Sequence, residues 1–478
     1  MNLIGRNNEV QELLELYNRK GSDLVAIYGR RRVGKTFLVN QVFNNSYDFR
    51  HAGVSPLETN GDKSLLSQQL EQFYNSLKIY GMKENKIPKT WLEAFYMLEK
   101  LLMEKDNGQK QLVFIDELPW LDTPKSMFLS AFEGFWNSWA NGRNIMVIIC
   151  GSANSWIVNK VINNHGGLYD RVTKQIKLVP FTLKECEMFF KDRDIRLSRY
   201  DIIQAYMAVG GVPYYLMCFE RMLSIYENID KMFFKKNATL SFEFDRLFSS
   251  AFSSPETVKR IVEVLATKRI GYSRDEINDV LKTKSGELIS NCLDALLVSD
   301  FVIKYRPLND KKKLYYKLID PFCLFYLQFV KDSTSLDINL FTNKAASQKV
   351  ISYRGLAFEN VCFNHIDEIK EALRIGGVAS TQSTFITRES EETPGAQIDL
   401  IIERNDNIVN LCEMKFYSDE FANNKDGHLS LVRKEDALSG FLKKKQIIRN
   451  TLITTYGLKY NEYSSDYISV ITIDDLFK

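Results

Sequence analysis

The stretch from Gly29 to Thr36 constrains the fold of this chain more than any other feature, because it reads Gly-Arg-Arg-Arg-Val-Gly-Lys-Thr. The spacing G-x-x-x-x-G-K-T is typical of a loop that binds nucleotide phosphates. The apolar run before it, residues 24–28, is expected to be a buried strand, and residues 37–43 after it have helical spacing. The sequence therefore predicts a strand, a phosphate-binding loop and a helix in this order.

Each part of this loop has a physical role. Glycine lets the backbone curl so that its N–H groups face phosphate, and the positive end of the following helix attracts the same charge. Lys35 is expected to reach the β- and γ-phosphates, and the Thr36 hydroxyl to bind Mg²⁺. ATP and Mg²⁺ are the cofactors that this loop implies. The predicted nucleotide-binding residues are Gly29, Arg30, Arg31, Arg32, Val33, Gly34, Lys35, Thr36 and Phe37.

The composition is that of an ordinary globular protein with room for about three domains in 478 residues. A net charge of +3 gives no general basic field for nucleic acid, so such a role would depend on local patches. The apolar runs are too short to span a membrane, and the first residues do not resemble a signal peptide. The seven cysteines are scattered without a C-x-x-C pair. We therefore expect a cytoplasmic protein with reduced thiols and no membrane partner.

Two further apolar runs end in polar residues that suit phosphoryl transfer. Residues 112–115 lead into Asp116 and Glu117, and residues 145–150 lead into Ser152 and Asn154. Asp116 is expected to hold Mg²⁺, and Glu117 to orient and polarise the attacking water. Ser152, rather than Asn154, is the candidate for sensing the γ-phosphate, although small polar residues after a strand also simply form turns.

Arg171 follows a Gly-Gly-Leu-Tyr-Asp segment and precedes a strand-like run at 175–178. It is either an arginine finger, supplied to its own or a neighbouring subunit, or one half of a surface salt bridge. Helical stretches at 64–80, 90–104 and 126–140 alternate with the strands. This alternation predicts an α/β fold in which a parallel sheet is covered by helices on both faces.

These motifs resemble the AAA+ and STAND-type P-loop ATPases, and most of all the prokaryotic "archaeal ATPase" family, over about residues 1–330. The opening residues 4–10 look like the N-terminal box of these ATPases, which packs near the adenine, and residues 210–216 resemble the G-x-P motif of their helical lid, which assigns Pro213 to the nucleotide site. The resemblance implies an ATPase core at 1–180 and a lid at 181–250. The three loop arginines, also typical of the family, either attract nucleotide or coat a basic edge.

Residues 251–330 resemble a winged helix-turn-helix domain. Helices are expected at 256–267, after a capping box at residues 273–276, and at 287–298, followed by strands at 301–305 and 314–318. Lys311, Lys312 and Lys313 in the turn would form a basic wing. The third helix offers no basic residue for DNA on its expected exposed face, so both a role in packing on the lid and DNA contact stay open. A transcription regulator is the weakest of the functions considered.

After a polar stretch at 332–348, which is expected to be a linker, the last segment (345–478) carries an acidic constellation. Glu359 is expected on a helix, Asp399 on a strand, and Glu413 and Lys415 on the next strand. Alternation in a strand places Glu413 and Lys415 on one face, where Asp399 can meet them. Asp399 and Glu413 would hold Mg²⁺, Glu359 would complete the shell, and Lys415 would position water or steady the phosphate.

This pattern resembles the PD-(D/E)xK superfamily of restriction-endonuclease-like enzymes. Gln397-Ile398 stands where a Pro-Asp pair is usual, and Pro394 lies upstream. The leading interpretation is an ATPase whose nucleotide state controls a metal-dependent nuclease, in defence against foreign DNA by analogy with similar fusions. The alternative is an ATP-driven switch or assembly factor whose C-terminal domain is an inactive partner-binding module. DNA, a partner protein and a second copy of the chain are the partners considered.

Overall fold

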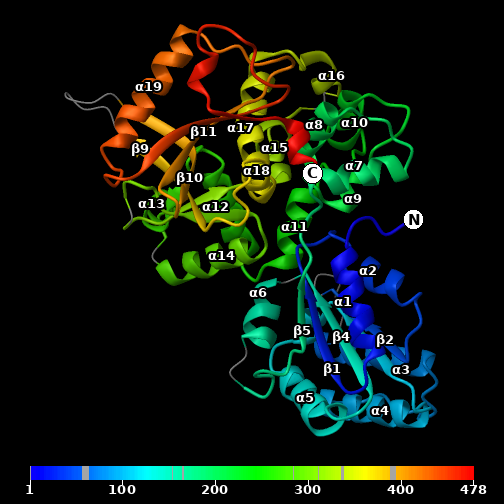
Figure 1. Cartoon of the computed structure of the whole chain (residues 1–478). Helices are drawn as coiled ribbons and strands as arrows, with labels where there is room; N and C mark the ends of the chain where they lie inside the picture. The colour runs from blue at the N-terminus through cyan, green and yellow to red at the C-terminus, as the bar shows by residue number, and fades with distance from the viewer. Residues whose placement is uncertain are drawn as a thin grey trace. The chain divides into compact units, whose positions relative to one another are not determined.

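The computed structural model describes residues 2–55, 64–152, 154–163, 166–283, 285–310, 312–334, 338–387 and 395–478, apart from the side chains of Asn154 and Ser250. They form two compact units (Figure 1). The first contains Met1–Val179 and Arg246–Pro255, and the second contains Pro180–Asp245 and Glu256–Lys478. The four segments expected from the sequence divide the chain more finely and stay a prediction. Lys311 and Pro394 lie outside the described residues.

The first unit is built on a parallel five-stranded sheet with the strand order β2-β3-β4-β1-β5. Its strands are β1 (Asp23–Tyr28), β2 (Phe49–Ala52), β3 (Gln111–Asp116), β4 (Ile145–Gly151) and β5 (Lys174–Lys177). The central strands β1, β3 and β4 are apolar and almost entirely buried, as expected for a sheet covered on both faces. The predicted parallel sheet is confirmed. The edge strand β2 was not predicted, because Phe-Arg-His-Ala is not an apolar run.

Helices cover both faces of this sheet, as predicted (Figure 1). On one face, apolar side chains of α1 (Asn7–Asn18) and α2 (Lys35–Val42) pack against Val25 and Ile27 of β1. On the other face, Phe73, Leu98 and Phe132 join the core below the sheet. They come from α3 (Leu65–Ile79), α4 (Trp91–Glu104) and α5 (Phe128–Gly134). Shorter helical turns are η2 (Leu118–Leu121), η3 (Phe135–Ala140), α6 (Asn154–Ile157) and η4 (Val158–Ile162).

The second unit begins with a helical layer. Its elements are α7 (Leu183–Asp192), α8 (Arg199–Val209), α9 (Pro213–Leu216) and α10 (Ile225–Phe233). The chain then passes through α11 (Glu243–Ala251), which belongs to the first unit from Arg246 onward. Helices α15 (Pro321–Phe325), η5 (Tyr326–Val330), α16 (Leu340–Lys344) and α17 (Gln348–Asn364) follow later in the chain. The backbone amides of Phe341 and Thr342 donate to the buried Asp230 carboxylate at 2.8 and 2.9 Å. The expected linker at 332–348 therefore contains a docked helix.

The elements expected between 255 and 318 are present. They are α12 (Pro255–Leu265), α13 (Arg274–Leu281), α14 (Gly286–Val298), β7 (Val302–Tyr305) and β8 (Tyr315–Leu318). An additional short strand, β6 (Tyr272–Ser273), gives a three-stranded sheet with the order β6-β8-β7. The capping box is confirmed, because the Ser273 amide donates to Glu276 Oε2 at 2.8 Å and the Glu276 amide to Ser273 Oγ at 3.3 Å. The resemblance to a winged helix stays a proposal.

The C-terminal sheet has the strand order β13-β12-β11-β10-β9. Its strands are β9 (Ser380–Thr387), β10 (Ala396–Arg404), β11 (Ile408–Lys415), β12 (Ile447–Thr454) and β13 (Ser469–Ile471). The pairs β9–β10 and β10–β11 are antiparallel, whereas β11–β12 and β12–β13 are parallel. Leu431 and Leu438 of α19 (Lys425–Ser439) pack against this sheet. Three short helices complete the unit: α18 (Ile366–Ala372), η6 (Ser464–Asp466) and α20 (Ile473–Leu476).

One irregularity of the C-terminal sheet bears on the candidate site. Strand β10 carries one extra residue relative to β9, because Ile398 pairs with Phe385 whereas Ile401 pairs with Ser383. Such a bulge turns a side chain away from the regular alternation.

Within the described ranges, every helix is too short or too polar to cross a membrane.

Candidate functional site

The loop between β1 and α2 has the geometry that its glycines require. Gly34 precedes α2 with a φ of 95°, in the left-handed region that glycine adopts most easily. At Gly29, a Cβ atom would lie only 2.1 Å from the carbonyl oxygen of Leu178, so no larger residue fits there without a shift of the backbone. The first residue of α2 is Lys35, whose buried ammonium group donates to the carbonyls of Gly29 and Arg30 at 2.8 and 3.1 Å.

Two side chains that suit Mg²⁺ meet beside this loop. The Thr36 hydroxyl donates to Asp116 Oδ2 at 2.6 Å, and Asp116 lies at the end of β3 with only 5% of its surface exposed. The second carboxylate oxygen of Asp116 accepts the backbone N–H of Glu117 at 3.0 Å. A hydroxyl and a carboxylate are hard oxygen ligands of the kind Mg²⁺ prefers. The residues present therefore fit a Mg²⁺ ion bound together with a nucleotide.

Glu117 is held by the end of the neighbouring strand. Its Oε2 accepts hydrogen bonds from both the backbone N–H and the hydroxyl of Ser152, at 3.2 and 3.0 Å. Ser152 directly follows β4, which lies between β1 and β3, so the sheet order brings Ser152 between the loop and the acids. Glu117 itself has a φ of 47°, a left-handed conformation that is uncommon for a residue other than glycine and often found at functional sites.

The electrostatics of this cluster couple its charged groups. Burial raises the pKa of Glu117 above its ordinary value, the Lys35 ammonium opposes this, and the Asp116 carboxylate adds to it. Burial lowers the pKa of Lys35, while the charges of Glu117 and Asp116 oppose that shift. One cation and two carboxylates thus share a site from which water is largely excluded, where each charge acts strongly on the others.

The remaining residues predicted for this site differ in their positions. Val33 is buried in the core below the loop, and Arg32 has a φ of 71°. Arg171 lies in an exposed turn, where its backbone N–H donates to the carbonyl of Leu168 at 3.1 Å. Pro213 is the first residue of α9 in the second unit. The sensing role of Ser152, the finger role of Arg171 and the nucleotide contact of Pro213 stay predictions.

The acidic residues of the C-terminal sheet lie among cations. Glu413 on β11 forms ion pairs with Lys434 of α19 and, at 3.5 Å, with Lys415. Asp399 on β10 lies beside the bulge, accepts from Gln397 Nε2 at 2.6 Å, and pairs with Arg269 Nη2 at 3.0 Å. The structure thus brings Glu413 and Lys415 together as predicted, whereas Asp399 binds a different set of partners.

Glu359 on α17 shares the cation that binds Asp399. Arg269 Nε donates to its Oε2 at 2.8 Å, a second guanidinium nitrogen pairs with its other oxygen, and the Lys317 ammonium lies 3.8 Å away. Within the part of the chain that the structure describes, no three His, Cys, Asp or Glu side chains form a group that could hold a metal ion. The shared metal shell of Asp399, Glu413 and Glu359 is therefore not assembled here, and their role as ligands stays a prediction.

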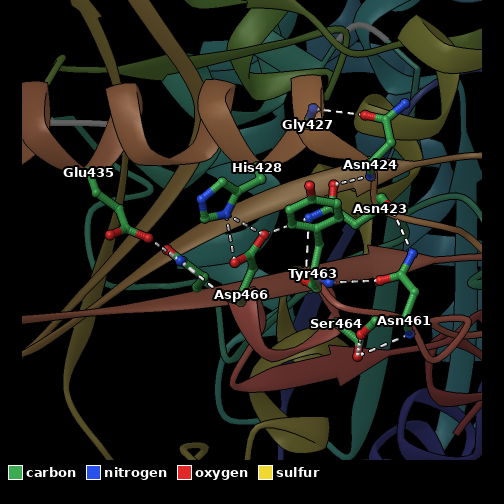
Figure 2. Close-up of polar contacts among 10 residues, drawn as sticks. Asn423, Asn424, Gly427, His428, Glu435, Asn461, Tyr463, Ser464 and Asp466 are labelled. Atoms are coloured by element: carbon green, nitrogen blue, oxygen red, sulfur yellow. Dashed lines mark hydrogen bonds and ion pairs between the residues drawn. The ribbon is translucent and has the colours of Figure 1, made fainter.

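A polar network fixes α19, the helix that carries Lys434. Figure 2 shows His428 paired with Asp466, whose carboxylate also accepts from Asn423. Asn424 caps the helix by accepting the N–H of Gly427 at 2.9 Å. Farther along α19, Glu435 pairs with Asn450, which also donates to the backbone of Asp466 at 3.0 Å. These contacts place Lys434 beside β11.

Sequence reasoning missed the three cations that neutralise these acids: Arg269, Lys317 and Lys434. Lys317 was an ordinary residue of a predicted strand, and Arg269 lies in a loop without a motif. The sequence indicated such a partner only indirectly. Glu359 lies in the middle of an apolar helix segment, and a buried carboxylate requires a cationic partner.

Comparisons with known proteins concern the first of the two sites, the nucleotide-binding loop with Asp116 and Glu117. Residues 3–219 match the model of an ATPase domain found predominantly in Archaea. An uncharacterized protein of Methanocaldococcus jannaschii is 26% identical over 373 residues, which cover 77% of this chain and 78% of that protein. An uncharacterized ATP-binding protein of the same organism is 25% identical over 246 residues, which cover 45% of this chain and 68% of that protein.

Among solved structures, the Walker-type ATPase PABY2304 of Pyrococcus abyssi aligns with a TM-score of 0.46 and 17% identity, over 68% of this chain and 96% of that one. The family match over residues 3–219 includes the phosphate-binding loop, Asp116, Glu117 and Ser152. This part of the chain is a P-loop domain of the ATPase type that binds ATP.

Proposed function

We propose that this chain binds and hydrolyses Mg²⁺-ATP in its first unit and uses its nucleotide state to control the C-terminal sheet domain, in the manner of AAA+ and STAND-type ATPases. The observation that carries the ATPase proposal is the cluster of Lys35, Thr36, Asp116 and Glu117 around one loop. This cluster combines a cation for the phosphates, oxygen ligands for Mg²⁺ and a carboxylate for the attacking water.

Each residue of the cluster has one part of the chemistry. Lys35 and the backbone N–H groups at the start of α2 bind the β- and γ-phosphates. Mg²⁺, when bound, offsets the charge that develops on the phosphate oxygens. Glu117 orients the attacking water and takes up its proton, for which its raised pKa makes the ionised carboxylate a stronger base. Ser152 holds that carboxylate in place through two hydrogen bonds.

The test is the release of phosphate from ATP by the full chain, with and without Mg²⁺. Asp116→Asn keeps the shape of the side chain and removes the charge that attracts Mg²⁺, so turnover should fall by about tenfold or more. Glu104→Gln, which changes an exposed acid at the end of α4, is the matched control and should behave as the wild type. Equal turnover in Asp116→Asn and wild type would contradict the proposal.

The second candidate function is metal-dependent hydrolysis of phosphodiester bonds by the C-terminal domain, with DNA as the favoured substrate and defence against foreign DNA as the setting. What supports it is the convergence of Glu359 and Asp399 on one cation, together with the pairing of Glu413 and Lys415 on the neighbouring strand. Carboxylates that converge on a cation suit Mg²⁺, and a lysine beside them suits a phosphate.

Cleavage of DNA and of RNA by the full chain, with Mg²⁺ or Mn²⁺ and with or without ATP, tests this function. Asp399→Asn and Glu413→Gln should each abolish cleavage to a similar extent, because residues of one catalytic site do not act additively. Glu420→Gln, an exposed acid beyond β11, is the control. If the wild type cleaves neither polymer under any of these conditions, the alternative remains: a module that binds a partner protein or a second copy of the chain.

A further inference from the structure

Arg269 is the residue that joins the acids of α17 and β10. It lies in the loop between α12 and β6, and its guanidinium binds both oxygens of Glu359 and one oxygen of Asp399. The Glu359 side chain is 1% exposed and the Asp399 side chain 16% exposed, whereas Arg269 remains 50% exposed. One cation thus reaches from the surface to a buried carboxylate and a partly buried one.

The two carboxylates require such a cation. Like charges that lie close together away from bulk water repel one another, and a counter-ion favours their ionised forms. Lys317 provides a second cation at 3.8 Å from Glu359. Arg269 is the cation that binds both acids, and it contacts Glu359 with the two-pronged geometry that guanidinium and carboxylate groups share.

The loop that delivers Arg269 is held by specific contacts on both sides of it. The Tyr305 hydroxyl of β7 donates to the carbonyl of Ile270, the residue after Arg269. Gly271 has a φ of 77° and lies very close to β8. A Cβ atom at this position would lie 1.9 Å from the backbone carbonyl oxygen of Tyr316. The Lys268 ammonium lies 4.1 Å from the centre of the Tyr272 ring. These contacts make the position of Arg269 part of the fold.

We propose that Arg269 is an internal competitor of divalent metal: while its guanidinium binds Glu359 and Asp399, these two acids do not act as metal ligands. This inference rests on the second candidate function, since it concerns the regulation of that site. A guanidinium and a hard divalent cation both bind carboxylate oxygens, so the two are mutually exclusive at one pair of acids.

The experiment measures Mn²⁺ binding to the nucleotide-free full chain, by the loss of the free Mn²⁺ signal in electron paramagnetic resonance. Arg269→Gln removes the competing charge and should bind Mn²⁺ at least about tenfold more tightly than the wild type, a change of about 1.4 kcal/mol. The gain should disappear in the double variant Arg269→Gln with Asp399→Asn. Arg274→Gln is the matched control, because Arg274 is a half-exposed arginine whose partner is the exposed Asp275.

A second variant covers the case in which Arg269→Gln fails to fold. Tyr305→Phe keeps every charge and removes only the hydroxyl that holds Ile270, so it should gain Mn²⁺ affinity in the same direction by a smaller factor. If both variants bind Mn²⁺ no better than the wild type, the inference is overturned. If Arg269→Gln gains metal but cleaves no nucleic acid, the competition stands and the nuclease proposal fails, so the two failures can be told apart.

Discussion

The Thr36 hydroxyl donates a 2.6 Å hydrogen bond to the Asp116 carboxylate, although the two residues lie 80 positions apart in the sequence. This contact joins the start of α2 to the end of β3, across the strand β4 that lies between β1 and β3. The carboxyl ends of parallel strands meet at one edge of the sheet, which is where ligands bind in folds of this kind. The Thr36–Asp116 contact is therefore the structural basis for placing Mg²⁺-ATP at this edge.

Glu117→Gln should separate the binding of ATP from its hydrolysis. The amide oxygen can still accept from Ser152, so the local geometry is kept, but the group can no longer take up a proton. We expect ATP affinity close to that of the wild type and turnover reduced by about 10²-fold or more. Titration of a fluorescent ATP analogue and steady-state phosphate release measure the two quantities. Unchanged turnover would mean that another residue activates the water.

Ser152→Ala should reduce turnover by less than Glu117→Gln does. It removes the hydroxyl bond at 3.0 Å to Glu117 but leaves the backbone bond at 3.2 Å. A hydrogen bond to a charged group contributes roughly 1.5–3 kcal/mol. Because the backbone bond remains, we expect an effect at the lower end of this range, which is about a tenfold loss in kcat, with ATP affinity little changed. Ser152→Thr restores the hydroxyl and should recover most of the activity. If Ser152→Ala and Ser152→Thr are equally impaired, the effect is one of packing.

Variants of Arg171 test whether a neighbouring copy of the chain completes the ATPase site. If it acts on a neighbour, specific activity should rise with protein concentration, and mixing Arg171→Ala with Lys35→Ala chains should restore part of the activity, because each supplies what the other lacks. Phosphate release measured across a dilution series provides the readout. Activity that is independent of concentration, without rescue in the mixture, would assign Arg171 to its own subunit or to the surface.

His365 should make stability sensitive to acid. Its Nδ1–H donates to the Val361 carbonyl at 2.8 Å and its Nε2 accepts the Leu183 amide at 2.9 Å, so the folded protein needs the neutral ring. Burial lowers its pKa to about 4 from the ordinary 6.5. Between pH 6.5 and pH 4 the unfolded chain therefore protonates His365, whereas the folded chain does not. The free energy of unfolding keeps the full contribution of His365 above about pH 6.5 and decreases by about 3 kcal/mol on acidification to about pH 4.

Urea unfolding of the second unit at several pH values checks this expectation. His365→Gln should be less stable near pH 7, because a fully buried group loses its partners, but its stability should fall less steeply on acidification. A slope in His365→Gln equal to that of the wild type would show that other groups set the acid response of the second unit.

The sequence was most informative where function depends on local spacing. The loop from Gly29 to Thr36 and the strand ends at Asp116 and Ser152 were predictable because each motif is continuous in the chain and adjoins an apolar strand. The contact of Ser152 with Glu117 was not, since it depends on strand order, which spacing alone does not specify.

The C-terminal acids show the opposite case. The prediction of one site assumed that Asp399 meets Glu413 and Lys415 on one face of the sheet. The bulge beside Asp399 interrupts the regular alternation of β10, and it depends on the pairing with β9. Arg269 is 90 positions from Glu359, and no motif connects them. Its role became visible only when the fold brought the loop before β6 onto α17 and β10.

The most direct test of the central claim is the affinity of the full chain for ATP, measured by calorimetry in wild type and in Lys35→Ala. Lys35 supplies the charge that meets the β- and γ-phosphates, and the exposed Lys83→Ala is the control for the loss of a lysine. We predict that Lys35→Ala binds ATP at least about tenfold more weakly, a loss of about 1.4 kcal/mol, whereas Lys83→Ala binds as the wild type does. Wild-type affinity in Lys35→Ala would contradict the assignment of the loop as the nucleotide site.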